Sequence, residues 1–456
     1  MENKPPIKIE SRPLYKTLAR VALPIALQSL ITSSLNLLDN LMIGSLGEVD
    51  LAAVGLSTQL FFVHLGAMFG FASGCAAFMA QFWGKQDVAS IRKVTGFAVT
   101  LSVSISLLFF LPAFLMPEKV LGLFTNIPEV IGLGKGFVRI ASVSFLTLGV
   151  TYPLSAVLRT TQQASIPLKI SAVVFSTNTV LNFILIFGNF GAPALGVRGA
   201  ATATATARIL ELLLYIYVIF VRKNLISGKL GEFFGWQKNL VAKVLITAMP
   251  VMVNEVMWSL GMAAYNAAYG RLGVTEFAAV QASNTLNTLF VLAIFSLGDA
   301  LLILVGQRIG MGQMDYAFAL AKRLLRIGFC VGAVSGGLLI LTSQFIIRLF
   351  NFTPEGQHYA LLILCIYGAM MPIKVFNGLN VTGTLRCGGD TRFAMFLEVG
   401  SVWLIGVPLV YLGAWYFALP VFIVVLMAQT EEAVKAVVCW RRFRSGKWLK
   451  NIVHDI

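Results

Sequence analysis

Residues 24–84 have the sequence PIALQSLITSSLNLLDNLMIGSLGEVDLAAVGLSTQLFFVHLGAMFGFASGCAAFMAQFWG, and a later part of the chain repeats its pattern. A shift of 226 residues aligns this stretch with residues 250–310 without a gap, and fifteen of the 61 aligned positions are identical. The identical pairs include Pro24 and Pro250, Gly44 and Gly270, Gln81 and Gln307, and Gly84 and Gly310. Apolar sequences produce chance matches, so the unbroken register and the repeated Gly, Pro and Gln carry the evidence. The sequence therefore predicts one fold unit that has been duplicated.

The composition indicates a membrane protein. Of the 456 residues, 57% are hydrophobic and 12% are charged, and the mean hydropathy is +0.82. A soluble core could not bury this much apolar surface. Twelve apolar runs are long enough to cross roughly 30 Å of hydrocarbon. They lie at 18–43, 51–83, 94–116, 128–156, 166–188, 197–221, 244–270, 276–309, 320–345, 357–384, 393–413 and 416–440.

The predicted fold class is therefore an all-α membrane protein with twelve transmembrane helices. Six spans fall in each half, and an even number returns the second half to the side on which the first began. The two six-helix lobes should be related by a parallel internal repeat. The polar segment 222–243 separates them, so we expect an N-terminal lobe at 1–221, a cytoplasmic linker at 222–243 and a C-terminal lobe at 244–456.

The basic residues predict the orientation. On this map the N-terminus, the even-numbered loops and the C-terminus carry 27 of the 35 Lys and Arg residues. The positive-inside rule then places both termini in the cytoplasm, in a multi-pass protein of the plasma (inner) membrane. The net charge of +15 favours contact with anionic lipid headgroups over nucleic-acid binding. We expect a monomer whose partners are membrane lipid and a small-molecule substrate, with no nucleic acid.

Motifs for energy-coupled enzymes are missing from the sequence. The chain has neither a G-x-x-x-x-G-K-[ST] phosphate loop nor an H-E-x-x-H metal motif, and its five cysteines lack metal or disulfide spacing. We therefore expect no enzymatic activity and no cofactor, with the energy taken from an ion gradient.

Charged residues inside the predicted spans are the main functional candidates, because each costs several kcal/mol in hydrocarbon. The predicted set is Asp39, Arg208, Glu211, Glu255, Asp299, Lys374 and Glu398. Arg208 and Glu211 are three apart on one helix, so we expect a structural pair. Five acidic against two basic residues favours cations in the interior.

Several short motifs occur in order along the duplicated chain. They are Leu38-Asp39-Asn40-Leu41-Met42-Ile43-Gly44, Gln81-Phe82-Trp83-Gly84, Leu158-Arg159, Ile186-Phe187-Gly188, Gly199-Ala200-Ala201-Thr202, Val305-Gly306-Gln307 and Leu385-Arg386-Cys387-Gly388-Gly389-Asp390-Thr391. Together they resemble the multidrug and toxic compound extrusion (MATE) transporters of bacteria over nearly the whole chain. The resemblance implies two six-helix lobes around a central cavity, and export of organic cations in exchange for H⁺ or Na⁺.

The resemblance also assigns residues in the first half. Asp39 resembles the aspartate on which cation coupling in the N-terminal lobe depends. Its neighbours by resemblance are Asn178, Asn182 and Thr204, an oxygen-rich set suited to Na⁺ or to proton exchange at the carboxylate. Some family members have a second aspartate where this chain has Asn182. The alternative is an interfacial Asp39 without a transport role.

In the second half, Glu255 resembles an acidic residue that many members use. Sodium-coupled bacterial members pair it with an aspartate near the place of Lys374. We expect Glu255, Asp299, Lys374 and Glu398 at one depth, facing a cavity in the C-terminal lobe. Lys374 is predicted as a tethered cation with Glu255 as its first partner and Asp299 or Glu398 as alternatives, while an unpaired Lys374 facing cavity water is the other interpretation.

The favoured function is secondary active efflux, an antiport of amphipathic organic cations and drugs against H⁺ or Na⁺ by alternating access. The alternative is a flippase for a lipid-linked precursor, from the same wider superfamily. Its anionic pyrophosphate headgroup would need a cavity rich in Arg and Lys. A membrane-embedded enzyme or receptor has no motif in its support.

Overall fold

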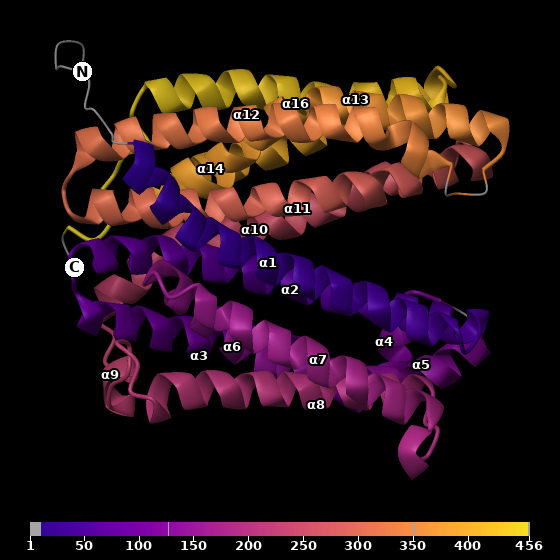
Figure 1. Ribbon diagram of the computed structural model, residues 1–456, viewed down its shortest axis with the longest axis horizontal. Helices are drawn as coiled ribbons and strands as arrows, with labels where there is room; N and C mark the ends of the chain where they lie inside the picture. Colours follow the sequence, from indigo (N-terminus) through magenta and orange to yellow (C-terminus); the bar gives the residue numbers. More distant parts are fainter. Residues whose placement is uncertain (1–10, 126, 349, 351, 455–456) are drawn as a thin grey trace. The chain divides into compact units, whose positions relative to one another are not determined.

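The computed structural model describes residues 11–125, 127–348, 350 and 352–454, and all regular secondary structure within these residues is helical (Figure 1). The chain forms two compact units. The N-terminal unit comprises residues 27–248, and the C-terminal unit comprises residues 11–26 and 249–454. The all-α prediction is confirmed.

The described residues of the first half form nine α-helices. They are α1 (Ser11–Gly44), α2 (Glu48–Gly84), α3 (Val88–Leu115), α4 (Pro117–Gly122), α5 (Pro128–Ala141), α6 (Val143–Thr160), α7 (Ser165–Phe187), α8 (Val197–Ile216) and α9 (Leu230–Phe234). A short 3₁₀ turn, η1 (Asn189–Gly191), follows α7, and a π-helical turn, η2 (Tyr217–Val221), extends α8.

The second half is built in the same way. Its helices are α10 (Lys238–Tyr269), α11 (Val274–Gly310), α12 (Met314–Ile347), α13 (Pro354–Gly378), α14 (Thr391–Ser401), α15 (Val407–Tyr411) and α16 (Val421–Arg444). Three π-helical turns join or extend them, namely η3 (Leu379–Leu385), η4 (Val402–Gly406) and η5 (Leu412–Tyr416).

Each of the twelve predicted spans coincides with a helical segment of the described chain. Ten of the segments are long and apolar enough to cross a membrane by length and composition. The other two predicted spans coincide with α11 and α16, and α16 carries Glu431, Glu432 and Lys435 in its middle. The predicted span 128–156 is two helices, α5 and α6, which meet at Ser142.

Four helices begin six or seven residues before the predicted spans, and two of them are α3 at Val88 and α12 at Met314. Helix α1 begins at Ser11 rather than at residue 18, and α10 begins at Lys238 rather than at residue 244. The first turns of both helices are polar and basic, and an apolar run marks only the part of a helix that suits hydrocarbon. The chain passes from one compact unit to the other after Ala26, within α1, and after Ala248, within α10. The lobe limits 1–221 and 244–456 stay a prediction.

The predicted linker packs closely against the N-terminal unit. A Cβ added at Gly96 of α3 would lie 1.8 Å from the carbonyl oxygen of Phe233 in α9, so only glycine allows this contact. Trp236 packs edge to face on Phe97, with ring centroids 5.6 Å apart. Segment 222–243 is therefore part of the folded N-terminal unit.

Glycines set the distance between α12 and α13, which run side by side (Figure 1). Gly328, Gly332 and Gly336 are spaced four apart and form one face of α12. A Cβ at Gly336 would lie 2.1 Å from the carbonyl oxygen of Gly368 in α13. Small residues at such spacing allow helices in membranes to approach closely.

This contact gives a prediction with a matched control one residue away. Gly336→Ala should destabilise the C-terminal unit by about 1–3 kcal/mol, because the added methyl group overpacks the contact with α13. A Cβ at Gly337 meets no atom within 4 Å, so Gly337→Ala should be neutral or stabilising by up to about 1 kcal/mol. Thermal unfolding of the detergent-solubilised proteins measures both, and equal melting temperatures for the two variants would contradict the packing argument.

Candidate functional site

A chain of hydrogen bonds joins the four residues that the sequence predicted for the N-terminal site. Asn182 Nδ2 of α7 donates to Asp39 Oδ1 of α1 at 2.5 Å and to Asn178 Oδ1 at 3.0 Å. Asn178 Nδ2 then donates to Thr204 Oγ1 of α8 at 3.4 Å. The structure thus brings Asp39, Asn178, Asn182 and Thr204 together from three helices.

The packing on either side holds these polar groups in place. Ile43 follows Asp39 by one helical turn and Ile186 follows Asn182 by one turn, and both are fully buried in one apolar cluster. A Cβ at Gly199 would lie 2.3 Å from the carbonyl oxygen of Leu185, so glycine brings the start of α8 onto α7. The two helices lie side by side (Figure 1). The polar site is therefore built on a rigid, close-packed end of the unit.

One acceptor in this site has no hydrogen-bond partner among the described residues. Asn182 Oδ1 is buried and unpaired, while the Nδ2 of the same amide donates twice. A buried acceptor without a donor costs free energy. Together with Asp39, Asn178 and Thr204, this oxygen makes a set of hard donors that fits a small cation such as Na⁺.

The nearby charges at Arg208 and Glu211 neutralise each other. Arg208 Nη1 lies 2.8 Å from Glu211 Oε2, which confirms the predicted pair on α8. Arg208 also acts electrostatically on Asp39. Asp39 therefore has an amide as its hydrogen-bond partner and a more distant, already paired cation.

In the C-terminal unit the predicted pairing of Lys374 with Glu255 is wrong. Glu255 Oε1 of α10 forms an ion pair with Arg386 Nη2 at 2.5 Å, and Arg386 is only 1% exposed. The charged groups that act on Lys374 are Glu432, Glu431 and Lys435, all from α16.

Apolar runs do not report how far neighbouring helices are shifted along their axes, and this shift decides which residue lies opposite Glu255. Arg386 follows Lys374 by twelve residues, about 18 Å along a helix. Glu255 therefore lies level with Arg386 at the end of this segment and not with Lys374.

A buried cluster on α16 was missed by the sequence analysis. Lys435 Nζ lies 3.0 Å from Glu432 Oε1 and 3.5 Å from Glu431 Oε1, and all three side chains are buried. The Tyr265 hydroxyl donates to Glu431 at 2.9 Å, and Asn377 Nδ2 donates to Glu432 Oε2 at 2.7 Å. The signal was available, because these charges lie three and four residues apart within a predicted span.

Glu398 lies within electrostatic range of both the Glu255–Arg386 pair and the α16 cluster. Asn254 Nδ2 donates to Glu398 Oε2 of α14 at 2.7 Å. Glu398 and Asp299 both act electrostatically on Glu255, and Glu398 acts on Lys435 as well. Glu255, Asp299 and Glu398 are thus close to one another, with Lys374 on the side of α16.

The internal repeat is visible in the contacts of two arginines. In the N-terminal unit Arg159 Nη2 donates to Gln28 Oε1 of α1 at 2.9 Å. Arg386 is the counterpart of Arg159, and it binds α10 at Glu255, one residue after the counterpart of Gln28. Each unit therefore has an arginine that clamps its first helix, and only the second clamp is an ion pair.

Comparisons with known proteins agree with this architecture. The family model described as MatE matches residues 24–184 and 250–412, which are the two copies of the repeat. An uncharacterized transporter, YisQ of Bacillus subtilis strain 168, is 25% identical over 452 residues, covering 96% of this chain and 97% of that protein. A probable multidrug resistance protein, NorM of Thermotoga maritima, is 23% identical over 451 residues, covering 98% and 96%.

A solved structure shows the same fold. The crystal structure of MATE in complex with MaL6 superposes with a TM-score of 0.86 at 18% identity, covering 95% of this chain and 97% of that one. The predicted twelve-helix fold with two six-helix halves is thereby confirmed. The family model covers more than half of the chain, so this multi-pass membrane protein belongs to the MatE family and is a transporter, not an enzyme.

Proposed function

We propose that this protein is a secondary active exporter that exchanges amphipathic organic cations for H⁺ or Na⁺ by alternating access. The observation that carries the proposal is the hydrogen-bonded chain from Asp39 through Asn182 and Asn178 to Thr204. Family membership supports transport, and the name of the Thermotoga maritima relative refers to multidrug resistance. The sequence has no phosphate-binding loop, so an ion gradient is the energy source.

Asp39 is suited to take up and release a coupling cation, because its hydrogen-bond partner, the Asn182 amide, carries no charge. A hydrogen bond to an ionised carboxylate is roughly twice as strong as one between neutral groups. Protonation of Asp39, or a Na⁺ ion bound to it, therefore weakens the bond from Asn182. This bond links α1 to α7. Cation binding at Asp39 thus changes how firmly α1 is held, which is the type of local event that can bias a conformational equilibrium.

The Asn182 amide offers a route for Na⁺ in particular. Its Oδ1 is unpaired, and a rotation of the amide would exchange the Nδ2 donor for this acceptor. The rotated amide would then contribute an oxygen ligand beside Asp39. For H⁺ no rotation is needed, because the proton binds to the Asp39 carboxylate itself.

The preference for cationic substrates follows from the charges of the C-terminal unit. The acidic residues of the two charge groups are Glu255, Asp299, Glu398, Glu431 and Glu432, and the basic residues are Arg386, Lys374 and Lys435; Glu431, Glu432, Arg386 and Lys435 are buried and the others are half-buried. The earlier count of five acidic and two basic residues omitted Glu431, Glu432, Lys435 and Arg386, yet acidic residues still predominate. A low-dielectric interior strengthens their attraction for cations.

The test is transport in energised membrane vesicles with two ions of matched size and opposite charge. Tetraphenylphosphonium uptake should depend on the ion gradient, and tetraphenylborate should not be taken up. Asp39→Asn should reduce gradient-driven uptake to background while the melting temperature stays within a few degrees, because the amide keeps the shape of the side chain but cannot bind a proton or balance Na⁺.

Asp50→Asn makes the same chemical change in the first turn of α2 and serves as the control, with uptake expected at the wild-type rate. Collapse of the pH and Na⁺ gradients in separate experiments identifies the coupling ion. Wild-type uptake by Asp39→Asn would place coupling elsewhere. A preference for tetraphenylborate would contradict a cation exporter and support the flippase alternative.

The Glu255–Arg386 pair has a structural role in this proposal. Arg386→Met should destabilise the protein by about 3 kcal/mol, because it leaves Glu255 buried without its cation. Combining it with Glu255→Gln should cost less than the sum of the two single changes, with a coupling energy of about 1–3 kcal/mol in thermal unfolding. Lys374→Met combined with Glu255→Gln should be additive. Coupling in the second pair and none in the first would reverse the assignment.

We also propose that residues 1–221 and 244–456 act as the two transport lobes and that the protein works as a monomer. A further proposal is that both termini face the cytoplasm in a plasma (inner) membrane. The distribution of 27 of the 35 Lys and Arg residues supports the orientation. A tag after the C-terminus should be removed by protease in inside-out vesicles and protected in right-side-out vesicles. The opposite pattern would invert the topology.

A further inference from the structure

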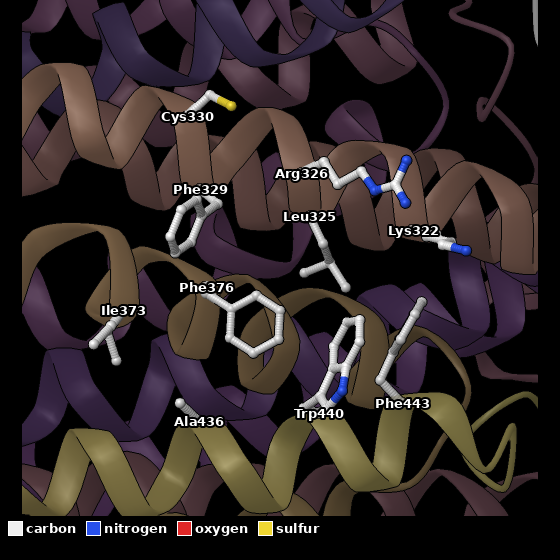
Figure 2. A pocket seen from close by; sticks show the side chains of 10 residues that line it. All are labelled: Lys322, Leu325, Arg326, Phe329, Cys330, Ile373, Phe376, Ala436, Trp440 and Phe443. Atoms are coloured by element: carbon white, nitrogen blue, oxygen red, sulfur yellow. The ribbon is translucent and has the colours of Figure 1, made fainter.

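A groove on the C-terminal unit is separate from the charged cluster described above. It has a volume of about 440 Å³ and lies where α12, α13 and α16 meet, as Figure 2 shows. This volume is within the range of roughly 300–1,000 Å³ that is usual for ligand sites. The lining residues are Lys322, Leu325, Arg326, Phe329, Cys330, Ile373, Phe376, Ala436, Trp440 and Phe443.

The lining residues come from all three helices, and those of α16 are regularly spaced. Ala436, Trp440 and Phe443 share one face of α16 by their spacing of four and three residues. Glu432 precedes Ala436 by one helical turn, but it and Lys435 are buried and neither lines the groove. The wall that α16 gives to the groove is therefore apolar, although the ion pairs lie on neighbouring positions of the same helix.

The groove is open and apolar along most of its length. Phe329 is 47% exposed and Trp440 is 44% exposed. The ring of Phe376 forms the floor between them, with its centroid 6.2 Å from that of Trp440 (Figure 2). Two of the three helices, α12 and α13, are long and apolar enough to cross a membrane. Exposed aromatic rings on such helices suit contact with hydrocarbon rather than with water.

Positive charges gather at one end of the groove. Lys322 and Arg326 are exposed and lie at the same end as Trp440 and Phe443 (Figure 2). The Arg444 guanidinium lies over the Trp440 ring, 5.6 Å from its centroid. None of the ten lining residues is acidic in the described structure. A tryptophan beside basic side chains is typical of the membrane interface, where lipid phosphates lie.

We propose that this groove binds one anionic phospholipid, with its phosphate group between Lys322 and Arg326 and an acyl chain along Phe329, Ile373 and Phe376. The distance along α12 from Lys322 to the far end of the groove at Cys330 is about 12 Å, which suits the first part of an acyl chain. A cationic drug is a poor occupant, because the basic end repels it. A lipid of net negative charge matches both the apolar wall and the cations.

Native mass spectrometry of the delipidated full-length protein tests the proposal, using phosphatidylglycerol and phosphatidylcholine with identical acyl chains. Phosphatidylglycerol should bind at least tenfold more tightly. Lys322→Ala with Arg326→Ala should weaken phosphatidylglycerol binding by about 10- to 30-fold, to the level of phosphatidylcholine, since each cation near a headgroup contributes about 1 kcal/mol. Lys223→Ala with Lys238→Ala removes two exposed cations outside the groove and should change binding less than twofold.

A second pair of variants tests the apolar wall. Ala436→Trp fills the groove from α16, and Ile373→Trp fills the same space from α13, so each should weaken binding of both lipids at least fivefold, with thermal unfolding as the folding control. Glycerol phosphate, which has a headgroup and no chains, should not displace phosphatidylglycerol. Unchanged binding in Lys322→Ala with Arg326→Ala, unchanged binding in both filled variants, or displacement by tetraphenylphosphonium would each overturn the proposal.

Discussion

Compensation of buried charge is the constraint on which the C-terminal unit depends. In hydrocarbon no water can solvate an ionised side chain, so each one needs a partner on its own helix or on a neighbouring one. Arg386 ties the end of α13 and η3 to α10 through Glu255, and Asn254 ties α10 to α14 through Glu398. Lys435 pairs with two carboxylates within α16. The charges thus determine which helices can be neighbours as well as what the interior attracts.

Asp39 of the N-terminal unit has a different kind of partner from Glu255 of the C-terminal unit. Glu255 is already neutralised by a guanidinium, while Asp39 receives one amide hydrogen bond and only a distant influence from Arg208. The proposed exchange of a coupling cation therefore favours Asp39, whose carboxylate has a neutral partner, over Glu255, whose carboxylate is already paired with a guanidinium.

The sequence was sufficient for the fold and for the N-terminal site, but not for the ion pairs of the second half. Hydropathy and the gap-free repeat predicted the helices, and motif resemblance grouped Asp39 with Asn178, Asn182 and Thr204, which the structure joins by hydrogen bonds. The partner of Glu255 was wrong because helix ends, tilts and π-helical turns set relative depth, and an apolar run reports none of them. The α16 cluster was overlooked because a span was judged by its average hydropathy.

The contacts of Arg159 and Arg386 show how the two halves of a duplicated protein can differ at equivalent positions. Arg159 holds the amide of Gln28, and its counterpart Arg386 holds the carboxylate of Glu255 on a neighbouring position. A guanidinium donates to an amide oxygen as well as to a carboxylate oxygen, so the arginine holds the first helix in both units although its acceptor differs in charge and lies one position further along. After a gene duplication, such a contact tolerates either kind of acceptor, so one copy can gain an ion pair where the other keeps a neutral hydrogen bond. The asymmetry between the halves could thus arise one substitution at a time.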